Sequence, residues 1–139
     1  MEITVHQNRP ETHLKSDEIK KLCKTIAAEI KLSAESCAVI FVDDSYLAEM
    51  HGQYLDDSNP TDIITFNLGS EKIEGELYIS IDRALEQAEE FGVSAGEEVY
   101  RLIIHGLLHL KGYNDTKPDE KSEMKRLEDK LVHNYCKKR

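Results

Sequence analysis

The sequence predicts an α+β (mixed α/β) fold, in which about five helices pack on a mixed sheet of about four strands. Two observations carry this prediction: several segments have apolar residues at helical spacing, and short runs rich in β-branched residues lie between them. Because the two kinds of segment alternate along the chain, the strands can form one sheet that the helices cover. With 139 residues and no internal repeat, we expect a single domain over residues 1–139.

The first third of the chain is expected to contain two strands and a helix. Residues 3–5 alternate weakly between apolar and polar, which favours a short first strand. Ser16 is a good N-cap for a helix of about 15 residues, whose apolar stripe includes Cys23 as a buried side chain. The run 38–42 is apolar throughout and rich in β-branched residues, so we expect a strand that is covered on both faces.

The middle of the chain predicts a helix, two strands and a second helix. Turn-forming residues separate these segments, and Gly92 ends the last of them. The expected bounds are a helix over about 44–54, strands over 61–67 and 76–81 with a loop over 71–75 between them, and a helix over 82–91.

Two helices are expected in the last third. Ser94 and Glu97 form a capping-box pattern at the start of the first, and Lys117 opens the second. The apolar face of the second helix is expected to hold Met124, Leu127, Leu131 and Tyr135.

Charge is distributed unevenly along this chain, whose net charge is −9. Residues 43–98 carry two basic and fifteen acidic side chains, a net charge of −13, whereas residues 99–139 carry ten basic and six acidic ones, a net charge of +4. A nucleic acid would have to be held by the C-terminal segment and the helix near residues 15–31, because the acidic middle repels phosphate. On charge alone, an acidic protein that touches no nucleic acid fits equally well.

Cysteine usage and hydropathy favour a cytoplasmic protein. The three cysteines, Cys23, Cys37 and Cys136, are widely spaced and odd in number, which favours free thiols in a reducing compartment. No apolar run approaches the roughly 20 residues that span a bilayer, and the first residues show no secretory signal. We therefore expect no membrane partner.

The stretch 105–115 contains the spacing H-x-x-x-H-x-x-G-x-x-D, formed by His105, His109, Gly112 and Asp115. Residues four apart share one face of a helix, so both imidazoles can reach one metal ion. The glycine lets the chain turn back, so that Asp115 can supply a third ligand from beyond a metzincin-like helix and loop. On a helical projection both histidines lie on the flank between core and surface, which suits metal ligands.

These residues predict one Zn²⁺, held by His105, His109 and Asp115, and no nucleotide cofactor. Two nitrogens and one carboxylate oxygen leave a coordination position open for water, as in a catalytic zinc site. The alternative for Asp115 is a turn residue or the N-cap of the last helix. A metallopeptidase is a remote alternative, because Gly106 replaces the glutamate of H-E-x-x-H and Glu98 lies about 10 Å away along the helix axis.

The sequence HGLLHLKGYND at 105–115 resembles the H-G-x-L-H-L-x-G-Y-D-H motif of the YbeY-type rRNA maturation factors. Tyr54, residues 60–62 and Phe66 resemble that family's Y-R-x-K-D-x-P-T-D-V-L-S-F block, and residues 75–79 resemble its G-D-I-x-I strand. Together these blocks cover roughly residues 46–115. The resemblance implies a bacterial metal-dependent endoribonuclease that is implicated in 16S rRNA 3′-end processing and ribosome quality control.

Two residues depart from the family pattern. Asp115 stands at the third family histidine, and a carboxylate oxygen can also bind zinc. Leu55 stands at the arginine that the resemblance assigns to RNA contact or catalysis, and leucine cannot bind phosphate. Arg101, one turn before His105, is either a substitute for that arginine or a surface residue paired with a glutamate.

Two further residues have alternative interpretations. Asp62 belongs either to a turn before its strand or to the cleft, and Tyr113 either packs beneath the metal loop or stacks on a base.

The resulting prediction is a hydrolase, a metal-dependent single-strand-specific endoribonuclease that acts in rRNA maturation. The metal is expected to activate water, with Asp62 and Arg101 as candidate catalytic residues. The expected partners are rRNA, the small ribosomal subunit and its associated proteins. The alternative is a ribosome-assembly or RNA-binding factor whose metal is mainly structural, which Leu55 and the acidic middle of the chain favour.

Overall fold

A mixed sheet forms the centre of the structure, a computed structural model that describes the backbone of residues 1–55 and 62–137 and the side chains of residues 1–50 and 62–136. Within these residues the sheet has four strands, in the order β1-β2-β4-β3, of which β1, β2 and β4 run parallel while β3 runs antiparallel to β4. The strands are β1 (Glu2–His6), β2 (Ala34–Val42), β3 (Ile63–Asn67) and β4 (Ile73–Ser80). The predicted mixed sheet is confirmed.

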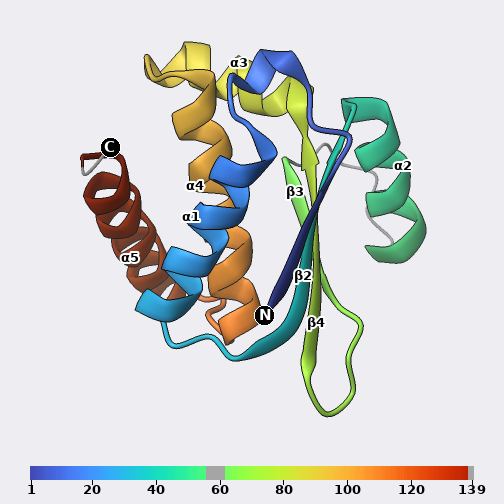
Figure 1. Ribbon diagram of the computed structural model, residues 1–139, viewed down its shortest axis with the longest axis vertical. Coiled ribbons are helices and arrows are strands. Elements are labelled where there is room, and N and C mark those ends of the chain that lie inside the picture. Colours follow the sequence, from blue (N-terminus) through green and yellow to red (C-terminus); the bar gives the residue numbers. More distant parts are fainter. Residues whose placement is uncertain (56–61, 138–139) are drawn as a thin grey trace.

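Five α-helices surround this sheet in the described part of the chain, as predicted. Figure 1 shows α1, α4 and α5 on one side of the sheet and α2 on the other. The helix α5 packs against α4, so α4 lies between α5 and the sheet. The bounds are α1 (Ser16–Glu29), α2 (Asp44–Leu55), α3 (Ile81–Phe91), α4 (Ala95–Lys111) and α5 (Pro118–Lys137), with a short 3₁₀ helix η1 (Pro10–Thr12) before α1.

The helix α4 is the most buried element of the fold. Val99, Ile103, Gly106 and Leu110 form a buried stripe along it, and Gly106 lies close to Leu77 of the sheet. Further residues, such as Leu108, are buried as well because neighbouring helices cover other sides of α4. A rigid, well-packed helix of this kind holds the side chains on its remaining flank in fixed positions.

The prediction that the strand at residues 38–42 is covered on both faces is only partly right, because Ala38 and Ile40 are half-buried. Cys37, Val39 and Phe41 are fully buried and alternate with half-buried residues, so one face carries the main core. On the opposite face, Val42 joins a small cluster with Leu47 and other residues of α2 and β3. Because α2 covers only one end of the sheet, the rest of that face is half-exposed.

Several element boundaries differ from the predictions by a few residues. The N-cap of α1 is Lys15 and not Ser16, and the Lys15 N–H donates to Glu18 Oε1 at 3.0 Å. Strand β4 begins at Ile73, inside the predicted loop, because residues 73–75 pair with β2 and β3. The turn-forming residues between α2 and β3, at 56–60, lie outside the described residues. No helix in the described ranges is long and apolar enough to cross a membrane.

Candidate metal centre

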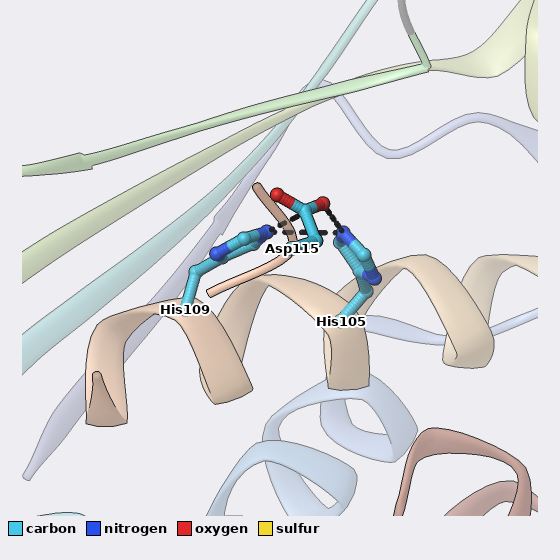
Figure 2. Close-up of side chains that lie close together, drawn as sticks. All are labelled: His105, His109 and Asp115. Carbon is cyan, nitrogen blue, oxygen red and sulfur yellow. Dashed lines mark hydrogen bonds and ion pairs between the residues drawn. The ribbon is translucent and has the colours of Figure 1, made fainter. Parts of the chain in front are cut away.

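The candidate metal centre is built on the last two turns of α4. Ser94 Oγ accepts a hydrogen bond from the Glu97 N–H at 3.1 Å, as predicted, and fixes the start of this helix. Gly112 ends it with φ of 117°, a conformation that side chains other than glycine rarely adopt. The chain then turns back, so that Asp115 faces His105 and His109 on the flank of the helix (Figure 2).

The structure brings the three predicted ligand residues together. The Nε2 atoms of His105 and His109 lie 3.1 Å apart, and Asp115 Oδ2 lies 3.7 Å from the first and 3.5 Å from the second. Ligand atoms at about 2.0–2.1 Å from a tetrahedral zinc ion lie about 3.3 Å from one another. The donor set therefore fits a zinc ion in both chemistry and spacing, and this group could hold a metal ion.

The backbone after α4 sets the tautomer of His109. His109 Nδ1 lies 3.0 Å from the carbonyl oxygen of Tyr113. A carbonyl can only accept, so Nδ1 carries the hydrogen and Nε2 presents its lone pair toward Asp115. Burial, together with the neighbouring charge of His105, lowers the pKa of His109, which favours the neutral imidazole that binds metals.

A carboxylate on α5 sets the orientation of His105. Glu128 Oε1 lies 2.6 Å from His105 Nδ1, and the Glu128 side chain is 7% exposed. Burial lowers the pKa of His105, but the hydrogen bond and charge of Glu128 outweigh it, so the pKa is raised overall. The Nδ1–H donates to the carboxylate, so in the neutral, metal-binding form of the ring the lone pair of Nε2 faces Asp115. Such carboxylate–histidine pairs orient metal ligands and increase their basicity.

Glu128 is the residue of this centre that the sequence prediction missed. It lies on the apolar face of α5, four residues after Met124 and three before Leu131, both of which are buried. A glutamate on such a stripe is costly to bury without a partner. That position was the signal that Glu128 pairs with a group on another element.

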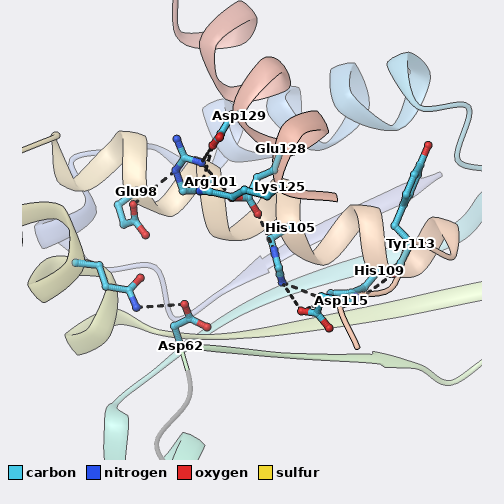
Figure 3. Close-up of polar contacts among 11 residues, drawn as sticks. Asp62, Glu98, Arg101, His105, His109, Tyr113, Asp115, Lys125, Glu128 and Asp129 are labelled. Carbon is cyan, nitrogen blue, oxygen red and sulfur yellow. Dashed lines mark hydrogen bonds and ion pairs between the residues drawn. The ribbon is translucent and has the colours of Figure 1, made fainter. Parts of the chain in front are cut away.

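Further charges fix Glu128 in place (Figure 3). Arg101 Nη1 lies 3.0 Å from Glu128 Oε2 and 2.6 Å from Asp129 Oδ1, and Lys125 Nζ lies 3.6 Å from Glu128 Oε2. The His105 and Arg101 hydrogen bonds outweigh the effect of burial and hold the pKa of Glu128 below its ordinary value. Arg101 is therefore ion-paired, as one of its two interpretations predicted, although only 25% of its side chain is exposed.

A pocket of about 880 Å³ lies beside the metal group. His105 and Asp115 line it together with Asp62 and Glu98, and α5 contributes cations that include Lys121. Pockets of this size accommodate small-molecule ligands. The basic segment predicted to face a nucleic acid thus borders the same pocket as the candidate metal ligands.

Asp62 lines the pocket, as the cleft interpretation predicted, whereas the turn interpretation involves Thr61, which lies outside the described residues. The carbonyl oxygen of Asp62 accepts a hydrogen bond from the Ser80 N–H at 3.0 Å, just before β3. Its carboxylate lines the pocket and accepts a hydrogen bond from Gln87 Nε2 at 3.2 Å. Tyr113 packs partly buried against the core, as the packing alternative predicted. The side chains of Tyr54 and Leu55 lie outside the described residues.

Gly106 cannot be replaced by the glutamate of a zinc peptidase without a steric clash. A Cβ atom at this position would lie 2.7 Å from Leu77 Cδ2 and 3.1 Å from Ile63 Cδ1. Gly106 faces the sheet and not the histidines, so close packing of α4 on the sheet accounts for the glycine.

Comparison with known proteins identifies the family. The family model described as "Endoribonuclease YbeY" matches residues 2–136. The chain belongs to the YbeY family. Two curated relatives with that name come from Bacteroides thetaiotaomicron, 38% identical over 120 residues (86% of this chain, 88% of the relative), and Cytophaga hutchinsonii, 43% identical over 115 residues (81% and 80%). The predicted family is confirmed, and all residues of the candidate centre lie within the stretch that matches the YbeY model.

A solved structure supports the fold of this YbeY-family chain. The solution structure of a Thermotoga maritima protein aligns with a TM-score of 0.64, covering 98% of this chain and 93% of that protein. The two sequences are 23% identical, so this likeness bears on the fold alone.

Proposed function

We propose that this chain is a metal-dependent endoribonuclease that cuts single-stranded RNA in the maturation of the 16S rRNA 3′ end and in ribosome quality control. It acts in the cytoplasm as a single domain over residues 1–139, with rRNA, the small ribosomal subunit and associated proteins as partners. The observation that carries the proposal is the His105, His109 and Asp115 group inside a chain that matches the YbeY family. Its curated relatives bear the name Endoribonuclease YbeY.

The chain's own residues hold and orient the metal in this proposal. His105 Nε2, His109 Nε2 and a carboxylate oxygen of Asp115 are the ligands, and Glu128 and the Tyr113 carbonyl fix the two imidazoles. A zinc ion held in this way supplies Lewis-acid chemistry, which activates water and stabilises charge on a phosphoryl oxygen.

The substrate is positioned by the pocket beside the metal group. Cations of α5, among them Lys121 and Lys125, border this pocket and offer contacts to the RNA backbone. Asp62 and Arg101 also line it and are the candidates for direct contact with the reacting nucleotide. Arg101 is held by Glu128 and Asp129, so it presents a fixed charge there.

The test compares His109→Ala with His133→Ala on single-stranded 16S rRNA fragments. His133 is an exposed histidine of α5 and serves as a matched control. We expect zinc-loaded wild type and His133→Ala to cleave the fragments and the His109→Ala variant to lose cleavage. Duplexes of the same sequence should resist all three proteins. Equal cleavage by the His109→Ala variant and wild type would overturn the proposal.

A ribosome-assembly factor with a mainly structural metal is the second candidate. The observation that favours it is the acidic middle of the chain, whose Asp62 and Glu98 face the pocket and repel phosphate. This candidate predicts binding to the small subunit without cleavage, and a large drop in melting temperature when zinc is removed by a chelator. If chelation abolishes RNA cleavage and leaves the melting temperature unchanged, the metal is catalytic and this candidate fails.

A further inference from the structure

Glu98 is a buried carboxylate, and its Oε1 atom lacks a hydrogen-bond partner in the described part of the chain. Its side chain is 2% exposed. Arg101 forms only a long ion pair with it, with Nε 4.0 Å from Oε1 and so beyond hydrogen-bond distance, and donates its hydrogen bonds to Glu128 and Asp129. An unsatisfied buried acceptor costs stability, so its presence beside a pocket points to a ligand that completes it.

The surroundings of Glu98 favour a ligand that donates hydrogen bonds and has a flat apolar face. The carboxylate of Asp62 lines the same pocket, and in Figure 3 the Glu98 carboxylate points from α4 toward the side on which Asp62 lies. Two carboxylates offer only acceptors when ionised. The ring of Phe91 also lines the pocket and is 62% exposed, unusually open for a phenylalanine. We name Asp62, Phe91 and Glu98 the Glu98 subsite.

The Glu98 subsite lies within one nucleotide of the candidate metal centre. Glu98 precedes His105 by seven residues on α4, which places it about 10 Å away along the helix axis. This separation is comparable to the length of a nucleotide from its phosphate to the far edge of its base. A phosphate at the metal group could therefore place its own base, or that of the adjoining nucleotide, in the Glu98 subsite.

We propose that the Glu98 subsite binds a nucleobase of the single-stranded substrate and prefers guanine. This inference rests on the proposed function, because it assigns a base preference to the same pocket. Guanine presents two neighbouring donors, N1–H and the N2 amino group, on one edge, and a carboxylate can accept from both. Proteins that recognise single-stranded RNA read such edges and stack the base on an aromatic ring, here Phe91.

Burial raises the pKa of Glu98 to about 7. At pH 8 the carboxylate is therefore mostly ionised and can accept both hydrogen bonds.

The experiment measures the binding of the four nucleoside 5′-monophosphates to the zinc-loaded protein at pH 8 by titration calorimetry. Wild type is compared with Glu98→Gln, Phe91→Ala and the control Glu90→Gln, an exposed glutamate of α3 that does not line the pocket. All four ligands share the phosphate, so differences between them report on the base. Melting temperatures verify that each variant is folded.

We expect guanosine monophosphate to bind wild type and Glu90→Gln at least about tenfold more tightly than the other three nucleotides. The Glu98→Gln variant should lose this advantage, and Phe91→Ala should weaken all four nucleotides by about fivefold or more. Equal binding of the four nucleotides by wild type, or an unchanged guanine preference in Glu98→Gln, would overturn the proposal. A Glu98→Gln protein that binds one metal ion fewer than wild type would also overturn the proposal, because Glu98 would then be a metal ligand.

The RNA cleavage assay separates this proposal from the proposed function. If wild type binds guanosine monophosphate selectively through Glu98 but cleaves no RNA, the Glu98 subsite stands and the endoribonuclease proposal fails. If RNA is cleaved while the nucleotides bind equally, the endoribonuclease proposal stands and the Glu98 subsite fails.

Discussion

Glu128 Oε1 lies 2.6 Å from His105 Nδ1, so a carboxylate of α5 orients a candidate metal ligand on α4. The two residues are 23 positions apart in the sequence. Their contact depends on the packing of α5 against α4, which also brings Arg101 to the other oxygen of Glu128. The metal centre therefore includes a part of the fold that the motif at 105–115 does not contain.

Replacing Glu128 should weaken zinc binding while leaving all three ligands in place. We expect Glu128→Gln to lower zinc affinity about tenfold and Glu128→Ala up to about 100-fold, because partners of this kind orient the imidazole and increase its basicity. Competition with a chelator of known affinity measures both changes. Glu123→Gln serves as the control, since Glu123 pairs with Arg126 on the exposed side of α5, away from His105. Unchanged affinity in Glu128→Ala would refute the orienting role.

Asp115 should contribute to zinc binding through its negative charge. We expect Asp115→Asn to bind zinc more than about tenfold more weakly, because an amide oxygen is a poorer zinc ligand than a carboxylate. Asp115→His should restore the affinity to within about tenfold, since a neutral imidazole is also a good zinc ligand. The same chelator competition at pH 7 measures both variants. Wild-type affinity in Asp115→Asn would show that Asp115 is not a ligand.

Glu98 should make the protein less stable as the pH rises. Its pKa is about 7 in the folded state and near 4.5 in the unfolded chain, so between these values the folded state binds more protons. The free energy of unfolding therefore falls as the pH rises from about 4.5 to above 7. The Glu98→Gln variant lacks this pH dependence. Its free energy of unfolding, relative to that of wild type, should therefore rise on the order of 2–3 kcal/mol between pH 5 and pH 8.

Urea unfolding of the metal-free protein at pH 5 and pH 8 measures the effect of Glu98→Gln. Glu90→Gln, an exposed variant, should show no such difference between the two pH values. A Glu98→Gln protein whose stability relative to wild type is the same at both pH values would contradict the raised pKa.

Gly106→Ala should destabilise the fold. The added methyl group would lie 2.7 Å from Leu77 Cδ2 in a fully buried contact, and overpacking of this kind costs about 1–3 kcal/mol. The higher helix propensity of alanine, worth about 1 kcal/mol, offsets part of this cost. Chemical denaturation should show a net loss in the free energy of unfolding. Gly92→Ala at the end of α3 is the comparison, because its added Cβ strains the backbone and meets no neighbouring atom. A Gly106→Ala variant as stable as wild type would show that Leu77 can move aside.

The fold was predictable because each element carries a local pattern. The apolar spacing of α1 and α4, the Ser94 cap and the β-branched residues of β2 were visible in the sequence and were confirmed. The coverage of β2 was not predictable from its composition, because it depends on where α2 packs. An apolar run shows that a strand is suited to burial, but the neighbouring elements determine which of its faces is covered.

The candidate site was predictable only where its residues are close in sequence. The spacing of His105, His109 and Asp115 depends on one helix and one turn, so the sequence was sufficient to group them. Glu128 and Glu98 join the site through the packing of α4 against α5 and the sheet, and such long-range contacts leave a weak local signal. For Glu128 that signal was a charge on an apolar stripe, whereas the burial of Glu98 was not visible in the sequence.

The order of residues along the chain also determines when the metal centre is completed during synthesis. Translation produces α4, with both histidines, before it produces α5. A nascent chain that stops short of α5 lacks the carboxylate that orients His105. The candidate ligand His105 therefore gains its orienting carboxylate only after α5 has emerged from the ribosome and docked on α4. For an endoribonuclease, this order keeps the candidate site incomplete until the chain that carries it has folded.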